Sequence, residues 1–442
     1  MYILISKFNQ NLKKINTINV SLFFLFSFVL FGGIYHISNS SFNFELENQF
    51  RKAFLAFFCL SLFHNINWNK KLLNIFSYLM AAWCIIIFLN LLKYISNNQD
   101  YYRAFKMLEQ GLASFIIVTF IYQNIERINK VVALFFYNLR FQFIFIFIFL
   151  FLIIGSFYSE TIMHNLCNGF GDNRVNYSIT LSGFIVFILL FFTINKVNFS
   201  SNPSLFRFFI ILFLVFEILA LIVNSGGRLG LVAALLSLIY FSYKLGKVHL
   251  LITVILLSLF LYRPNFLNMQ CNDGVIRDIY RYTSSPKPIP SNTENVNSSS
   301  YVVLRNAYET IDNYTSGRLY LISKGFESLD IDHILQGKGI DRFIVVSKYG
   351  DPARVHNLFL STLGDLGIVS FFILCGFAIT PFLARQGFNK HLKMHKFVCL
   401  IWTLLAFFQP EILITQIHSS IPYFFSYAYL LKEFLKPNKV NN

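Results

Sequence analysis

The sequence Arg-Val-His-Asn-Leu at residues 354–358 marks the point where a polar segment of the chain turns into an apolar one. The apolar run continues to Leu383, which is long enough to cross a bilayer, because a spanning helix needs about 20 apolar residues. His356 and Asn357 are therefore expected where a membrane helix meets water, directly after the long hydrophilic segment 263–355. An imidazole there is either a polar helix start or a group for acid–base chemistry at the membrane surface.

The composition is that of a polytopic membrane protein. Of the 442 residues, 55% are hydrophobic and 13% are charged, whereas soluble domains carry about 25% charged residues. Phenylalanine alone supplies 55 residues, some in runs such as 143–149. Helix is predicted there, because a lipid-facing segment must satisfy its own backbone hydrogen bonds. The apolar stretch at 21–35 lacks a signal-peptide cleavage site and is predicted to be the first span.

The distribution of charge predicts the orientation of the chain. The net charge is +16, yet segment 263–356 holds 11 basic and 10 acidic residues and is nearly neutral. The excess therefore lies in short connections between apolar segments, as expected for cytoplasmic loops. This distribution explains the basic character without nucleic acid as a partner. Lysines before the first span and after the last predict that both termini are cytoplasmic.

We therefore predict an all-α polytopic membrane protein with about twelve transmembrane helices. Residues 1–262 hold spans one to nine, residues 263–356 form a large outer loop with amphipathic helices, and residues 357–442 hold spans ten to twelve. Residues 131–140 are expected along the inner surface. The approximate spans are 19–36, 52–66, 72–94, 104–125, 141–158, 178–195, 205–223, 228–243, 248–262, 357–384, 397–414 and 418–435.

The outer loop has two parts. Residues 283–300 are rich in Ser, Asn and Pro, cannot build a core, and are predicted to be mobile. Residues 301–353 are predicted to contain a helix that lies on the outer surface of the bundle. The supporting signals are a helix cap at Thr315 or Ser316, an apolar stripe of Leu319, Ile322, Phe326 and Leu329, and a turn at Gly337 and Gly339.

The six cysteines fall into two groups. Cys167 and Cys271 are both on the outer side in this topology, where a disulfide would persist, and the sequence leaves open whether they are bridged. The remaining four are predicted to be small buried hydrophobes within spans, namely Cys59, Cys84, Cys375 and Cys399.

Four polar features are expected to face the outer side. Arg174 lies just before span six, Arg228 opens span eight, Arg318 starts the loop helix, and His356 with Asn357 opens span ten. Guanidinium groups at helix starts, beside free backbone N–H groups, suit a phosphate or pyrophosphate. Any one of these arginines could instead anchor the chain to lipid headgroups.

Other chemistries lack a signature in the sequence. No group of His, Cys, Asp and Glu has metal-ligand spacing, and no nucleotide-binding loop or nucleophile elbow occurs. We therefore predict no metal and no cofactor. Glu217 in span seven and Glu411 late in span eleven are conspicuous intramembrane acids, although two scattered acids are a weak basis for a proton relay.

The arrangement resembles the O-antigen ligase superfamily of membrane glycosyltransferases, which also contains O-antigen polymerases and protein O-oligosaccharyltransferases. His356 and Asn357, followed after nine residues by Gly367, are similar to the family's histidine motif. Ser370 stands where the family usually has Gly, Thr or Tyr. This spacing is moderately specific for the superfamily and poorly specific within it.

Further stretches carry the same resemblance. Residues 316–320 and 337–339 look like the family's loop helix and glycine turn, and residues 224–228 look like its outer arginine turn. The resemblance covers about 224–384. Before that it is mainly one of topology, with Arg174 a weaker match.

The resemblance implies a metal-independent, inverting glycosyltransferase of the bacterial inner membrane with its site facing the periplasm. Its donor would be a glycan on undecaprenyl pyrophosphate, and its acceptor a hydroxyl of lipid A–core, as in O-antigen ligation, or of another lipid-linked glycan, as in polymerisation. His356 would be the base with Asn357 in support, while Arg228, Arg318 and Arg174 would bind the pyrophosphate.

A transporter is the alternative from a different class, because twelve spans is also a transporter count. Many transporters contain repeats with helices broken in mid-membrane. Here the distinctive polar residues gather on one face instead, which favours an enzyme over a flippase or permease.

Overall fold

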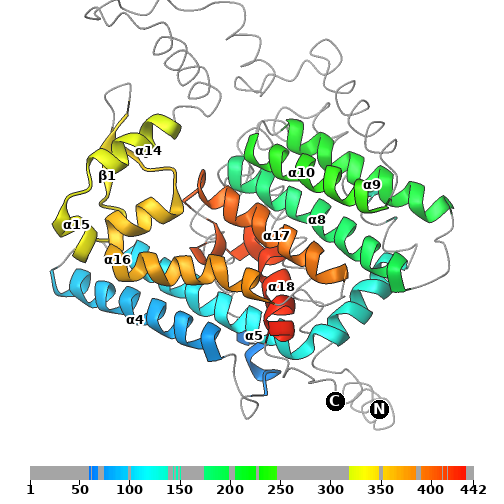
Figure 1. Cartoon of the computed structure of the whole chain (residues 1–442), viewed down its shortest axis with the longest axis horizontal. Coiled ribbons are helices and arrows are strands. Elements are labelled where there is room, and N and C mark those ends of the chain that lie inside the picture. The colour runs from blue at the N-terminus through cyan, green and yellow to red at the C-terminus, as the bar shows by residue number, and fades with distance from the viewer. Residues whose placement is uncertain are drawn as a thin grey trace, which may run out of the picture.

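The structure is a computed structural model, and the part of the chain that it describes is mostly helical (Figure 1). The described residues are 59–60, 62–67, 74–97, 101–137, 143, 146, 147, 150, 174–198, 205–224, 228–245, 318–347, 352–384, 390–410, 412–415 and 417–434.

The helices of the described part coincide with eight of the predicted spans and with the predicted loop helix. Helix α16 is extended by the 3₁₀ helix η2 (Thr380–Leu383), and η3 (Leu413–Thr415) precedes the last helix. The α-helices are α4 (Asn74–Ser96), α5 (Tyr102–Tyr137), α8 (Arg174–Asn198), α9 (Leu205–Asn224), α10 (Arg228–Leu245), α14 (Arg318–Glu327), α15 (Ile331–Gln336), α16 (Leu358–Ile379), α17 (Lys390–Ala406) and α18 (Ile417–Phe434).

Three described helices are long and apolar enough to cross a membrane, namely Ile75–Ser96, Tyr102–Asn129 and Leu358–Leu383. Shorter apolar helices occur at Ser178–Ile194 and Ile210–Ile222, and also at Leu229–Lys244. Predicted spans one and nine, most of spans two and five, residues 283–300, and both Cys167 and Cys271 lie outside the described residues. The structure therefore supports a helical membrane protein.

The structure marks the end of span four by a kink and displaces span eleven. Helix α5 kinks at Asn124, close to the predicted end of span four, and a helix continues from there to Tyr137 in the segment expected along the inner surface. No proline or glycine stands between these two positions to end the helix. Span eleven was predicted at 397–414, but α17 ends at Ala406, because a helix stops at or before the residue that precedes a proline, here Pro410.

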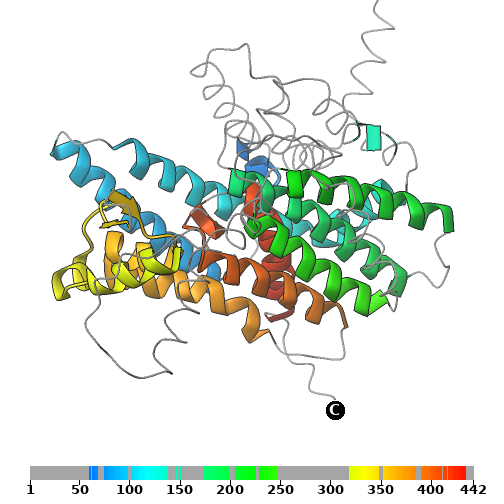
Figure 2. The same ribbon diagram turned by 90° about the horizontal axis from the view of Figure 1, so that it is seen from above.

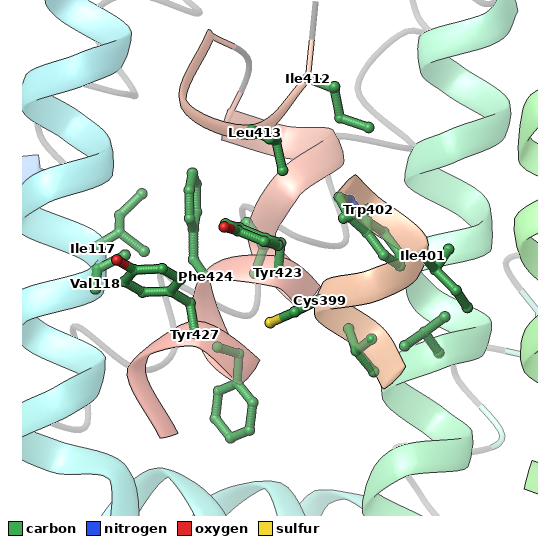
Figure 3. Close-up of a cluster of buried hydrophobic side chains, with 14 of the residues drawn as sticks. Ile117, Val118, Cys399, Ile401, Trp402, Ile412, Leu413, Tyr423, Phe424 and Tyr427 are labelled. Atoms are coloured by element: carbon green, nitrogen blue, oxygen red, sulfur yellow. The ribbon is translucent and has the colours of Figure 1, made fainter. Parts of the chain in front are cut away.

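The helices pack into one bundle. Helix α8 contacts α9 and α10 on one side of the molecule, α18 contacts both α5 and α8, and α16 contacts α4 and α17 (Figures 1 and 2). Buried aromatic side chains fill the centre between α17 and α18 (Figure 3). Two of their polar atoms have backbone partners: Trp402 Nε1 donates to the Ser419 carbonyl (2.6 Å) and Tyr423 Oη donates to the Phe377 carbonyl (2.8 Å).

The segment 318–354, here called the loop unit, packs against the start of α16 (Figure 1). It contains α14, α15 and two antiparallel strands, β1 (Ile344–Val346) and β2 (Pro352–Arg354), with Val345 opposite Ala353. A small set of buried residues joins the loop unit to α16. This loop core consists of Leu321, Phe343, Val345, Val355 and Leu360.

The predicted apolar stripe of α14 is only partly right. Ile322 and Leu329 pack at the edge of the loop core, but Phe326 is 62% exposed. The buried residues of the helix are Leu321 and Gly325. Because Gly325 has no side chain, α14 approaches Val355 and Leu360 closely along this line, and Phe326 is turned away. The predicted turn at Gly337 and Gly339 is confirmed, with positive φ at both residues.

Helix α16 is interrupted at Gly367, whose φ of 80° and ψ of −177° are not helical. The interruption divides it into a first half at 358–366 and a second half beginning at 368. The first half contacts the loop unit, and the second half packs against α4, where the ring of Phe377 contacts that of Phe76 (Figure 1).

Candidate functional site

The structure brings two of the predicted site residues together, although they are 38 positions apart in the chain. Arg318 is the first residue of α14, and His356 lies between β2 and α16. Both side chains are half-buried. Burial lowers the pKa of His356 to about 4, and the positive charge of Arg318 contributes to the shift. The imidazole is therefore neutral at pH 7 and lies within the electrostatic reach of the guanidinium.

The end of α17 fixes the position of Arg318. Its Nη1 donates to the carbonyl oxygen of Phe408 (2.7 Å), two residues beyond the last residue of α17. Carbonyl groups at a helix C-terminus carry partial negative charge, which favours a guanidinium there. The rings of Phe359 and Phe407 pack with centroids 5.0 Å apart, so the start of α16 and the end of α17 are neighbours.

Asn357 fixes the backbone that carries His356. Its side-chain Oδ1 accepts a hydrogen bond from the Leu360 N–H (2.8 Å) and caps the N-terminus of α16. Asn357 is also buried, with 6% of its surface exposed. This amide oxygen therefore holds the start of α16 next to the residue that carries the imidazole.

The hydrogen-bonding capacity of the His356 imidazole is not fully satisfied by the described residues. Its Nδ1 atom is buried and has no hydrogen-bond partner among the described residues. In a neutral imidazole one ring nitrogen donates and the other accepts. No described neighbour of Nδ1 therefore selects one tautomer.

Arg174 and Arg228 begin α8 and α10, as predicted for residues at helix starts. The structure does not describe these two side chains, but the positions of the two helix starts can be compared. A Cβ on Gly230 would lie 2.3 Å from the carbonyl carbon of Ser178. The first turns of α8 and α10 are therefore in contact, and the two arginines begin helices at the same end of the bundle.

The loop unit is attached to the ends of α4 and α5. Asp341 accepts from Arg354 (2.8 Å) and from Arg103 at the start of α5. Tyr94, near the end of α4, donates to the Ile340 carbonyl (3.3 Å), and Arg342 lies over its ring. The candidate site therefore lies at the same end of the bundle as the α4–α5 connection.

Several residues of this neighbourhood were not predicted from the sequence. They are Tyr94, Arg103, Asp341, Asp365 and the Phe408 carbonyl. The one available signal was Asp365, an acid in an apolar run between Gly364 and Gly367. The others belong to segments far apart in the chain, which local spacing does not relate.

Other candidate groups do not join this site. Among the described residues no three His, Cys, Asp or Glu side chains are grouped to hold a metal ion. Glu217 in α9 is buried, and neither carboxylate oxygen has a hydrogen-bond partner in the described part. Glu411 lies outside the described residues. The four cysteines in helical segments are free, with Cys399 buried and the others half-buried.

No protein-family model matches this chain, and no curated protein matches it at a significant level. The chemistry of the site is therefore argued from its own residues and geometry.

Proposed function

We propose that the protein is a membrane glycosyltransferase. It moves a glycan from undecaprenyl pyrophosphate to an acceptor hydroxyl at the periplasmic face of the bacterial inner membrane. Within this class we propose an O-antigen ligase, with lipid A–core as acceptor. The observation that carries the proposal is the Arg318 charge within electrostatic reach of a neutral, half-buried His356 at the start of α16.

The reaction needs a general base and a group that stabilises negative charge, and these two residues can supply both. The acceptor oxygen attacks the anomeric carbon of the donor sugar, and the bond from that carbon to the pyrophosphate oxygen breaks with its electron pair. His356 takes the acceptor proton as general base. Arg318 stabilises the negative charge that develops on the departing pyrophosphate. Attack opposite the leaving group inverts the anomeric centre.

The electrostatics couple donor binding to the strength of the base. Burial and the charge of Arg318 keep the pKa of His356 near 4, so the imidazole is unprotonated but a weak base. A bound pyrophosphate would bring negative charge beside Arg318 and favour the imidazolium. The pKa of His356 would then rise, and the base would become effective only when the donor is in place.

Arg228 and Arg174 are proposed as further ligands of the pyrophosphate. The support is the contact between the first turns of their helices. Arg318→Lys should lose most transfer, because an ammonium does not reproduce the forked guanidinium. Arg228→Lys should be milder if that residue acts mainly through its charge. If the arginines only anchor the bundle to headgroups, both substitutions should be nearly silent.

The full topology belongs to the same proposal. We propose twelve spans, cytoplasmic termini and a periplasmic loop at 263–356. The attachment of the loop unit to the α4–α5 connection supports a common side for these segments. A cysteine introduced at Ser298 should react with an impermeant reagent in cells with a permeabilised outer membrane. Reaction only after rupture of the inner membrane would place the loop in the cytoplasm and end the proposal.

A gel of surface polysaccharide from a deletion strain tests the assignment. Loss of a ligase leaves lipid A–core without polymer, which is the expected pattern. Lipid A–core that carries one repeat unit would instead indicate the alternative, an O-antigen polymerase. Substrate-specific uptake by vesicles that contain the purified protein would favour a transporter. A strict requirement for added Mg²⁺ or Mn²⁺ would contradict the metal-free mechanism.

A further inference from the structure

We infer that Asp365 is a positioning residue of the site, which together with the turn at 337–339 holds the Arg318 helix against the segment that carries His356. Only the catalytic consequence rests on the proposed function, since the positioning itself is open to direct measurement. The argument begins at the interruption of α16.

The turn at 337–339 packs against the interruption of α16 at Gly367. The N–H of Lys338 donates to the Gly364 carbonyl and the N–H of Gly339 donates to the Asp365 carbonyl, both at 2.8 Å. In a regular helix these carbonyls bond to residues four positions further on. The non-helical backbone of Gly367 turns the chain just where the loop unit supplies its own donors.

The fit between the two backbones leaves no room for side chains. A Cβ on Gly337 would lie 2.3 Å from the Asp365 carbonyl oxygen, and a Cβ on Gly367 would lie 2.6 Å from the Leu335 carbonyl oxygen. Both residues also have positive φ, at 74° and 80°, a region that favours glycine. This contact therefore requires glycine at both positions.

The Asp365 side chain adds a second tie. Its Oδ1 accepts from the N–H of Phe343 (2.8 Å) and from the N–H of Arg342 (3.1 Å). A partly buried acceptor of two backbone N–H groups contributes more than an exposed ion pair, and the Arg342 N–H also donates to the Gly339 carbonyl (3.1 Å). Asp341, which is 24% exposed and pairs with Arg103 and Arg354, is the weaker attachment.

Phe343 transmits this positioning to the site. Its ring is 2% exposed and belongs to the loop core. Leu321 in the same core is three residues after Arg318, and Val355 immediately precedes His356. Withdrawing Phe343 from this core would therefore loosen α14 relative to the histidine. Asp365 acts on the site through the core, without touching the reacting groups.

The test compares Asp365→Ala with Asp365→Asn, because the asparagine amide oxygen still accepts both N–H groups. Asp332→Ala, an exposed acid of the same loop unit, is the matched control. The readout is the rate of carbethoxylation of His356, followed by mass spectrometry of its peptide between pH 8 and pH 5 and corrected for reagent hydrolysis. Only neutral imidazole reacts, so this readout requires no donor, acceptor or turnover.

The wild type, the Asn variant and the Asp332→Ala control should react at pH 5 within about 10% of the rate at pH 8, as expected for a pKa near 4. In Asp365→Ala, separation from Arg318 and entry of water should raise the pKa of His356 toward about 6.5. The rate at pH 5 should then fall by up to about 30-fold. Arg318 is the charged group whose effect on His356 is resolved, so Arg318→Ala should move the profile in the same direction.

Two further results decide the matter. If Asp365→Ala does not fold, Gly337→Ala breaks the same contact from the loop side and should give the same shift in a protein that elutes as wild type. A wild-type profile in a well-folded Asp365→Ala protein would overturn the positioning role, and so would a full shift in the Asn variant. If the wild type transfers no glycan but the profile of Asp365→Ala is still shifted, the positioning role is kept and the proposed function is rejected.

Discussion

The two halves of α16 have similar apolar sequences but different surroundings. In the first half, Leu358, Phe359, Leu360 and Leu366 are all at most 8% exposed, although a lipid-facing helix leaves one side uncovered. In the second half, Val369 and Phe372 are 59% and 64% exposed. The first half is enclosed by protein and carries the candidate site at its start, whereas the second half has the open face of a membrane span.

This difference shows what an apolar run does not reveal. Hydropathy alone treats 357–384 as one span, because lipid and a protein interior favour the same side chains. The interruption at Gly367 separates the half that is enclosed by protein from the half that has the open face of a membrane span. The polar atoms of the first half, including the Asp365 carboxylate, are tolerated there because the loop unit supplies their hydrogen-bond partners.

The largest expected effect is at the start of the first half. His356→Ala should reduce transfer by about 10²–10⁴-fold, the usual loss for a general base, while the protein stays at wild-type level in the membrane. The matched control is His395→Ala. That histidine is fully buried, contacts Ser426 Oγ (3.2 Å) and stacks on Tyr429, so its loss should lower abundance before activity. The measurement is the transfer rate of purified variants with a lipid-linked donor, with membrane abundance measured separately. Wild-type turnover by His356→Ala would remove His356 from the mechanism.

The boundary between the halves affects the stability of the fold. Gly367→Ala should destabilise the fold by about 1–3 kcal/mol from backbone strain alone, and its Cβ would also press on the Leu335 carbonyl. Gly376→Ala in the second half is the control. There the Cβ would meet only the flexible Leu79 side chain, at 3.1 Å, and alanine favours helix by up to about 1 kcal/mol. Thermal unfolding in detergent should therefore separate the two variants clearly, and equal midpoints would mean that the interruption is not a fixed feature.

A pair of phenylalanines measures the difference in burial directly. Phe359→Ala removes a buried ring that packs on Phe407, and such deletions cost about 3–5 kcal/mol. Phe372→Ala removes a ring that is mostly exposed and should change the unfolding midpoint little. A large loss at Phe372 would show that protein covers the second half as well, through a helix outside the described residues or a second copy of the chain.

The sequence predicted the positions of the helices well where apolar runs are bounded by basic clusters, as for α4, α9 and α10. It was less successful for span eleven, predicted at 397–414, because α17 begins at Lys390 and ends at Ala406. The orientation of α14 was missed at Phe326, because spacing defines a stripe but not which part of it faces a neighbour. That choice was made by Gly325, whose close approach to α16 is a property of the assembled structure.

For the site, the sequence indicated which residues to examine but not how they are held. Arg318 and His356 were identified from their positions at helix starts and from the family resemblance. Of the neighbours that fix them, Asp365 gave only the signal of an acid in an apolar run, and the Phe408 carbonyl, from a distant part of the chain, gave none. A single sequence indicates chemistry through residue type, whereas the exchange of hydrogen bonds between distant backbones becomes visible only in three dimensions.

The smallest expected effect is the response of transfer to moderate acid. An unperturbed histidine has a pKa of about 6.5, so a typical base would lose activity between pH 7 and pH 5. The pKa of His356 in the free protein is lowered to about 4, and a group with a depressed value stays unprotonated until the pH falls through it. The apparent kcat/KM, which reports free-enzyme ionisations, should therefore change by less than about twofold from pH 7 to pH 5 and decline only near pH 4. In contrast, kcat reports the donor complex, where pyrophosphate beside Arg318 raises the pKa, so its acid limb should lie at higher pH. Coincident limbs for the two parameters would mean that donor charge does not reach the histidine, and the coupling between Arg318 and His356 would then have no role in the reaction.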